Sequence, residues 1–377
     1  MNSRLPALIP VLALTLVSLQ IAACGVSAPV STRSRQQAAT PSGQWQIEPT
    51  GQLGQVQAAS CPTTKFCIVI DRSGFVVSKD GGLTWGRGLF AASPNKFIGS
   101  SVSCPSSAKC VVAGVGGPSL QPTVAVSTDA AGTWRIQQLD GGAGSALNAV
   151  ACPTESFCVT AGSAYDAQLH TVIYVSRDGG SGWGKATVGE EVDVSGIACA
   201  SDRNCMAVGY AIRNATNGPP AIVRTDDGGH RWTSKLVDNP PALDNLTCAT
   251  NGRCLSVGLS TRNIVTAEPV IFVQDDATHS FTRNLVPLGV AWLNDVSCGT
   301  PLFCVAVGYA SGYAGTAENA TRIPAIVTSN DGGKTWRREG IPSNVSEVIT
   351  VACQATLRCT AGAVTNPFGY VVLSRTP

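Results

Sequence analysis

LNAVACPTESFCVTAG, residues 147–162, places two cysteines six positions apart, and runs of alternating small and apolar residues flank them. Two such runs around a short polar loop are typical of a β-hairpin, here with one cysteine at each strand end. Six other segments share this spacing. The seven pairs are Cys61/Cys67, Cys104/Cys110, Cys152/Cys158, Cys199/Cys205, Cys248/Cys254, Cys298/Cys304 and Cys353/Cys359.

The pairs recur along the chain with a regular period. Their first cysteines are separated by 43, 48, 47, 49, 50 and 55 residues. A period of this length indicates a repeat architecture in which each unit is one supersecondary element. Zinc binding is a poor alternative, because structural zinc sites prefer closer cysteines with further ligands nearby, and the chain has three histidines.

A second motif follows the cysteines within most repeats. It ends in tryptophan and occurs as SKDGGLTW (78–85), STDAAGTW (127–134), SRDGGSGW (176–183), TDDGGHRW (225–232) and SNDGGKTW (329–336), with a degenerate copy, QDDATHSF (274–281). These segments resemble the Asp-box, S-x-D-x-G-x-x-W, of the BNR-repeat β-propellers. The motif suits a turn, because aspartate bonds its own backbone and glycine permits positive φ. We therefore expect it to be structural, between the third and fourth strands of each repeat.

The resemblance implies an all-β fold, a seven-bladed β-propeller with four-stranded antiparallel blades and one disulfide in each blade. The last repeat stops early, at GYVVLSRTP (369–377), before its turn is complete. PSGQWQIE (41–48) contains Gly43 and Trp45, which fit the missing Gly-x-Trp. We predict that this N-terminal segment supplies the fourth strand of blade 7 and closes the ring.

The N-terminus has the form of an export signal, in which Arg4 precedes an apolar run from Leu5 to Ala23. Ile21, Ala22, Ala23 and Cys24 resemble the lipobox of bacterial lipoproteins. We predict a signal peptide at 1–23, a flexible tether at 24–42 from lipidated Cys24, and the propeller at 43–377. The protein would be extracytoplasmic, anchored by lipid to the bacterial membrane, and its cysteines would form disulfides. The alternatives are an ordinary signal peptide with a chance cysteine, or an uncleaved anchor.

The charge of the folded part is close to neutral. Arg4, Arg33 and Arg35 lie before it, which leaves 23 basic residues against 24 acidic residues. A nucleic-acid partner is disfavoured, because nucleic-acid binding normally requires a basic face. We expect no cofactor and no metal.

In a four-stranded blade, the disulfide loops and the Asp-box turns lie at one end of the ring, here called the disulfide face. The loops between second and third strands vary in length and lie at the other end, the variable face, where function is expected. Aromatic and arginine side chains gather in these loops and suit a glycan, peptide or protein ligand. The candidate binding residues are Tyr165, Tyr210, Arg213, Arg262, Trp292, Tyr309, Tyr313 and Arg322.

Similar propellers include sialidases and the photosystem II assembly factors, so the resemblance does not choose between enzyme and binding module. Arg322, Ile323 and Pro324 match an Arg-Ile-Pro of sialidases but lie in the sixth blade rather than the first. A glycosidase also needs paired carboxyl groups, and no spacing marks such a pair among Glu190, Glu191, Asp193 and Glu318. We predict no catalytic residue and a non-catalytic binding or scaffold module. The alternatives are an Asp-box glycoside hydrolase resembling an exo-sialidase and a purely structural envelope protein.

Overall fold

The computed structural model describes residues 43–90, 97–165, 168–189, 191–213, 216–237, 242–259, 268–274, 281–314 and 321–376. The predicted signal peptide and tether lie outside these ranges, as do Glu190, Arg262 and Glu318. Within the described ranges, no helix is long and apolar enough to span a bilayer.

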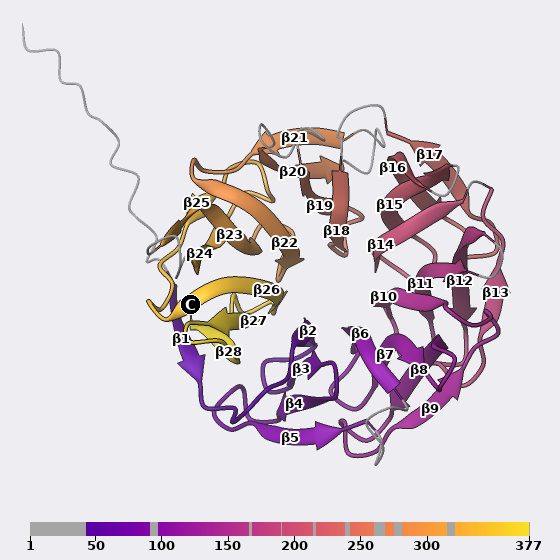
Figure 1. The fold of residues 1–377 in the computed structure, drawn as a ribbon, viewed down its shortest axis with the longest axis horizontal. Coiled ribbons are helices and arrows are strands. Elements are labelled where there is room, and N and C mark those ends of the chain that lie inside the picture. The colour runs from indigo at the N-terminus through magenta and orange to yellow at the C-terminus, as the bar shows by residue number, and fades with distance from the viewer. Residues whose placement is uncertain are drawn as a thin grey trace, which may run out of the picture. The chain divides into compact units, whose positions relative to one another are not determined.

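The described residues form seven four-stranded antiparallel sheets arranged as blades around a central axis (Figure 1). Blades 1 to 3 consist of β2 (Val56–Ser60), β3 (Cys67–Asp71), β4 (Gly74–Ser78) and β5 (Gly86–Leu89); β6 (Phe97–Ser103), β7 (Cys110–Gly116), β8 (Gln121–Ser127) and β9 (Arg135–Gln138); and β10 (Ala146–Ala151), β11 (Cys158–Tyr165), β12 (Leu169–Ser176) and β13 (Gly184–Ala186). Blades 4 to 6 consist of β14 (Val192–Cys199), β15 (Cys205–Arg213), β16 (Thr216–Thr225) and β17 (Thr233–Leu236); β18 (Ala242–Cys248), β19 (Cys254–Leu259), β20 (Pro269–Gln274) and β21 (Phe281–Leu285); and β22 (Val290–Cys298), β23 (Cys304–Ala314), β24 (Thr321–Ser329) and β25 (Arg337–Arg338).

Blade 7 is assembled from both ends of the propeller. Its strands are β26 (Val345–Cys353), β27 (Cys359–Thr365), β28 (Gly369–Thr376) and, outermost, β1 (Gln44–Glu48). β1 pairs antiparallel with β28, and Gln44 lies opposite Thr376. The prediction that the N-terminal strand closes the ring is confirmed, and so is the seven-bladed fold.

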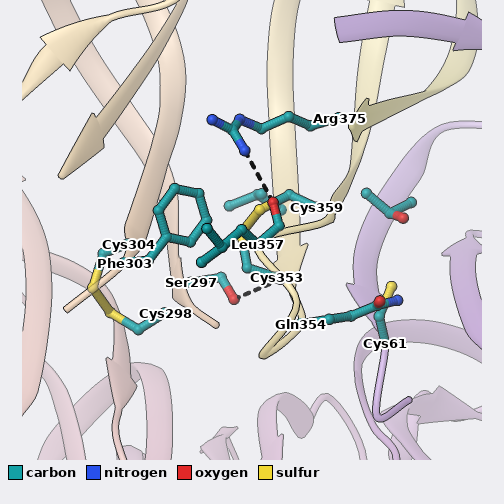
Figure 2. The surroundings of a disulfide bond; sticks show 12 residues. Cys61, Ser297, Cys298, Phe303, Cys304, Cys353, Gln354, Leu357, Cys359 and Arg375 are labelled. Carbon is teal, nitrogen blue, oxygen red and sulfur yellow. Dashed lines mark hydrogen bonds between the residues drawn. A yellow bond between two sulfur atoms is a disulfide. The ribbon is translucent and has the colours of Figure 1, made fainter. Parts of the chain in front are cut away.

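One disulfide joins the first and second strands of every blade, as predicted. The Cα atoms of the seven pairs are 4.0–4.2 Å apart, because the two cysteines of a pair lie at facing ends of neighbouring strands. In blade 7, Cys353–Cys359 lies beside the ring closure, where the Arg375 guanidinium reaches the carbonyl of Leu357 (Figure 2).

The core lies between blades, and its sequence pattern follows strand position. The second and third strands are covered on both sides by neighbouring blades, and all five residues of β3 and all six of β20 are buried. The outermost strands are short and mostly exposed, which limits the free edge available for aggregation. The innermost strands direct some residues into the core and others toward a central channel, and β-bulges interrupt strict alternation.

Candidate partner-binding site at the mouth of the channel

The five intact Asp-box segments lie at the turn between the third and fourth strands, as predicted, and residues 275–280 of the degenerate copy lie outside the described ranges. In blade 1, Ser78 Oγ donates to Asp80 Oδ1 at 2.8 Å, and the amide and hydroxyl of Thr84 donate to the same carboxylate at 2.9 and 2.5 Å. The hydrogen bonds from Thr84 lower the pKa of Asp80 to about 2. The aspartate holds its own turn together, as the structural interpretation of the motif requires.

The innermost strands surround a channel of about 860 Å³ that extends from the disulfide face to the variable face. Its wall is rich in uncharged hydrogen-bonding side chains. They include Gln57, Ser101, Asn148, Ser195, Asn245 and Asn294.

Some of these side chains join neighbouring blades. In three blades the backbone amide of the first cysteine donates a hydrogen bond of 2.9–3.0 Å to a serine hydroxyl of the preceding blade. The accepting atoms are Ser60 Oγ, Ser103 Oγ and Ser297 Oγ. The bond from Cys353 to Ser297 is drawn in Figure 2. Asn148 Nδ2 similarly donates to the Val194 carbonyl at 2.8 Å. The polar wall therefore stabilises the ring as well as facing the channel.

Asp295 is the acidic member of this inter-blade network. Asn245 Nδ2 donates to Oδ1 at 2.8 Å from blade 5, and Thr350 Oγ1 and the Val351 amide donate to Oδ2 at 2.8 and 2.9 Å from blade 7. Burial nevertheless raises the pKa of Asp295 to about 6, because loss of hydration outweighs these donors. Asp295 is thus a structural carboxylate with an unusual proton affinity.

At the variable face, an arginine lies between a tyrosine ring and a carboxylate. The Arg322 guanidinium carbon is 4.3 Å from the centroid of the Tyr309 ring. Arg322 Nη1 also forms a 2.6 Å ion pair with Glu347 Oε2, which joins blade 6 to blade 7. Arg322 and Glu347 both line the channel.

An aromatic ledge continues the same mouth on blade 7. Phe368 lies in the turn between β27 and β28, and Tyr370 is the second residue of β28; their rings pack edge to face with centroids 5.2 Å apart. Both line the channel with Val364, and Phe368 is 79% exposed. A large apolar ring held open at the end of a polar channel offers an anchor for a ligand side chain.

The candidate binding residues do not form one cluster. Blade 6 brings together Trp292, Tyr309 and Arg322, because Trp292 lies opposite Tyr309 in the β22–β23 pairing and Arg322 packs over the Tyr309 ring. Tyr313 is opposite Arg322 in β23–β24, but its side chain is not described.

The other candidates lie further round the ring. Tyr210 and Arg213 are in blade 4, where Tyr210 Oη donates to Asp244 Oδ1 at 3.1 Å, and Arg213 is exposed. Tyr165 ends β11 in blade 3, and its side chain is not described. Sequence reasoning missed Glu347, Phe368 and Tyr370. The aromatic pair after Pro367 is the signal that could have identified blade 7.

The described acids of the glycosidase alternative take part in local structure. Glu191 Oε2 accepts the amide of Thr171, and Asp193 Oδ1 accepts the hydroxyl of Ser163. Each of these bonds joins blade 3 to blade 4. These two carboxylates therefore have a structural role at the boundary between blades 3 and 4.

No protein-family model matches the chain, and no curated protein matches it. Solved structures match its fold. A structure of YCF48 bound to D1 peptide is 15% identical, with a TM-score of 0.56, and the match covers 89% of this chain and 96% of that chain. The WD40 β-propeller domain of Doa1 is 10% identical, with a TM-score of 0.59 and coverages of 89% and 98%. The GH74 enzyme of Niastella koreensis is 13% identical, with a TM-score of 0.53 and coverages of 84% and 52%. These identities support a shared fold alone.

Proposed function

We propose that this propeller is a non-catalytic binding module that holds a peptide segment of a partner protein at the variable mouth of its channel. The observation that carries the proposal is the exposed ledge of Phe368 and Tyr370 beside the Arg322–Glu347 pair. An apolar side chain of the peptide packs on Phe368, and the peptide backbone bonds to amides and hydroxyls of the channel wall. The YCF48 structure with its bound D1 peptide supports this use of the fold by analogy.

Most side chains of the wall are uncharged, and the carboxylate of Asp295 already accepts hydrogen bonds from blades 5 and 7, which favours a ligand portion without a net charge. A charged group entering the channel would lose hydration with little opposite charge free to replace it. The Arg322–Glu347 pair at the mouth can meet polar groups of either sign at the rim. The preferred ligand therefore has an apolar anchor followed by neutral, hydrogen-bonding residues.

The proposal includes export to an oxidising compartment, since seven disulfides are typical of extracytoplasmic proteins. It also includes lipid attachment at Cys24. Metabolic labelling with a fatty-acid analogue tests the attachment: the full chain should incorporate label, and Cys24→Ser should not.

Peptide binding can be tested without knowing the natural partner. The purified protein is used to select from a random peptide library, and the dissociation constants of selected peptides are then measured. Phe368→Ala should weaken binding by about 2 kcal/mol, roughly thirtyfold, as expected for a central aromatic anchor. Leu83→Ala is a matched control, because Leu83 is 77% exposed but lies on the disulfide face.

Several results would contradict the proposal. They are failure to select any peptide, equal losses for Phe368→Ala and Leu83→Ala, and preferential binding on a glycan array. Turnover of fluorogenic sialosides or glucosides would instead favour the hydrolase alternative.

A further inference from the structure

The disulfide face carries exposed leucines on three neighbouring blades. Leu83 in the Asp-box turn of blade 1, Leu302 in the disulfide loop of blade 6 and Leu357 in that of blade 7 are 77%, 60% and 37% exposed. The other large apolar side chains exposed among the described residues are Leu89, Leu120, Leu285, Leu288, Ile323 and Phe368. Those six lie toward the variable face, so blades 6, 7 and 1 stand out at the disulfide face.

The repeat itself does not require leucine at these positions. Leu302 and Leu357 are both two residues before the second cysteine of their loops. The equivalent residues of the other blades are Lys65, Ala108, Ser156, Arg203 and Gly252. The equivalents of Leu83 in the other intact Asp-boxes are Gly132, Ser181, His230 and Lys334. Three leucines in three adjacent blades are thus a local departure from a polar pattern.

These leucines are held in place by their loops. The Leu302 carbonyl accepts the amide of Gly332 at 2.8 Å, and the Leu357 carbonyl accepts Arg375 Nη1 at 2.9 Å. The turn that carries Leu83 is tied to blade 7, because Arg358 Nη1 donates to the Gly81 carbonyl at 3.3 Å. With a disulfide closing each of the two loops as well, collapse of these side chains into the core is restricted.

Lysines outnumber carboxylates around the leucines. Lys65, Lys79 and Lys334 are exposed on the same blades, and the negatively charged Asp80 and Asp331 are bonded within their own turns. Lys65 and Lys79 line a shallow depression of about 470 Å³ between blades 1 and 2, together with the hydroxyl-bearing Thr63, Thr64 and Ser107. Ammonium and hydroxyl groups in this arrangement suit a phosphate group.

The chain also joins the propeller at this face. Gln44, the first residue of β1, lies opposite Thr376 at the end of β28, next to the pairing of Arg375 with Cys359. Gly43, the first described residue, therefore lies at the disulfide face of blade 7, between the blades that carry Leu302 and Leu83.

We propose that the disulfide face of blades 6, 7 and 1 is a membrane-contacting surface, whose partner is a bilayer containing anionic phospholipid. Leu83, Leu302 and Leu357 enter the interface between headgroups and acyl chains, and Lys65, Lys79 and Lys334 contact headgroup phosphates. Three separate leucine side chains form no continuous apolar groove for a protein partner, whereas a bilayer can deform around each of them. The variable face then points away from the bilayer. This inference does not depend on the partner site proposed above.

The contact can be mapped with the full chain reconstituted in vesicles of phosphatidylcholine and phosphatidylglycerol that contain a diazirine phospholipid. After irradiation, labelled peptides are located by mass spectrometry. We expect the label to concentrate on the segments around Leu83, Leu302 and Leu357. It should fall several-fold in vesicles of phosphatidylcholine alone.

Two sets of variants test the residues. Replacing Leu83, Leu302 and Leu357 together by serine should remove most of the label. Replacing Leu285 and Leu288 by serine should leave the label unchanged, although they are 65% and 97% exposed. Should the triple variant fail to form seven disulfides, Lys65→Ser with Lys79→Ser provides the second test and should lower the label in anionic vesicles. The proposal is overturned by label spread equally over both faces, by label concentrated on the variable face, or by label that the folded variants do not reduce.

Discussion

Trp45 Nε1 donates a 2.7 Å hydrogen bond to Glu339 Oε2, although 294 residues separate them in sequence. Glu339 also accepts hydrogen bonds of 3.0 and 2.9 Å from Nε and Nη2 of Arg375, and both partners of this ion pair are buried. The Arg375 guanidinium lies 5.0 Å from the centroid of the Phe303 ring. This cluster replaces the Asp-box in blade 7 and joins both ends of the propeller to blade 6.

Glu339→Ala should destabilise the protein strongly, because it leaves the buried Arg375 charge without its partner. Breaking a buried ion pair in this way typically costs about 3–5 kcal/mol. Urea unfolding measures the loss. Glu268→Ala is the control, since its 3.6 Å pair with Arg283 is exposed and should be worth less than about 1 kcal/mol. Similar losses in the two variants would contradict a special role for the closure.

Gly43→Ala should weaken the same closure by a steric effect. A Cβ atom at residue 43 would lie 2.3 Å from Arg375 Cζ, and the guanidinium is fixed between Glu339 and Phe303. We expect a loss of about 1–3 kcal/mol, as for other overpacked sites, measured by thermal or urea unfolding. Gly340→Ala is the matched control, because no atom lies within 4 Å of a Cβ added at that residue. The prediction fails if the two alanine variants unfold alike.

Protonation of Asp295 should increase the free energy of unfolding of the protein at pH 5 relative to pH 7. Its pKa is about 6 in the folded protein, against about 3.9 in an unfolded chain. The folded state therefore takes up the proton first, and this contribution to stability is complete below about pH 4 and is lost as the pH rises through 6.

Urea unfolding of the wild type and of Asp295→Asn at pH 5, 6 and 7 isolates this titration. The wild type should gain stability on acidification relative to the variant, whatever the absolute effect of the substitution. Asp244, whose pKa burial also raises, is present in both proteins and cancels in the comparison. Parallel pH profiles would show that Asp295 does not titrate in this range.

Most of the fold could be predicted from local sequence, because the residues that determine each hairpin and each turn lie close together within one repeat. The Cys-x5-Cys spacing places two cysteines at facing strand ends, and Ser78, Asp80 and Thr84 complete a turn within seven residues. Ring closure was also predictable, since the last repeat lacks a strand and Gly43 and Trp45 supply a fragment of the missing motif.

The candidate site depended on contacts between repeats, which local patterns do not encode. The sequence identified Tyr309 and Arg322 as candidates but not their pairing with Glu347, which comes from the next blade. The repeat order does place Tyr210 and Arg213 in blade 4, two blades away from them, as the structure confirms. The closure prediction likewise stopped at strand pairing. Trp45 donates to Glu339 of blade 6, whereas Trp183 and Trp336 donate to the carbonyl of a glycine in their own turns.

The sequence by itself determined the number of blades, the disulfide pairing, the turn motif and the strand that closes the ring, because these features rest on interactions among neighbours within one repeat. Tertiary structure alone decided which side chains share the mouth of the channel, that burial raises the pKa of Asp295, and how far Leu83, Leu302 and Leu357 are exposed. Those properties arise where separate repeats meet, so they depend on the order and rotation of blades around the axis and on the burial that results.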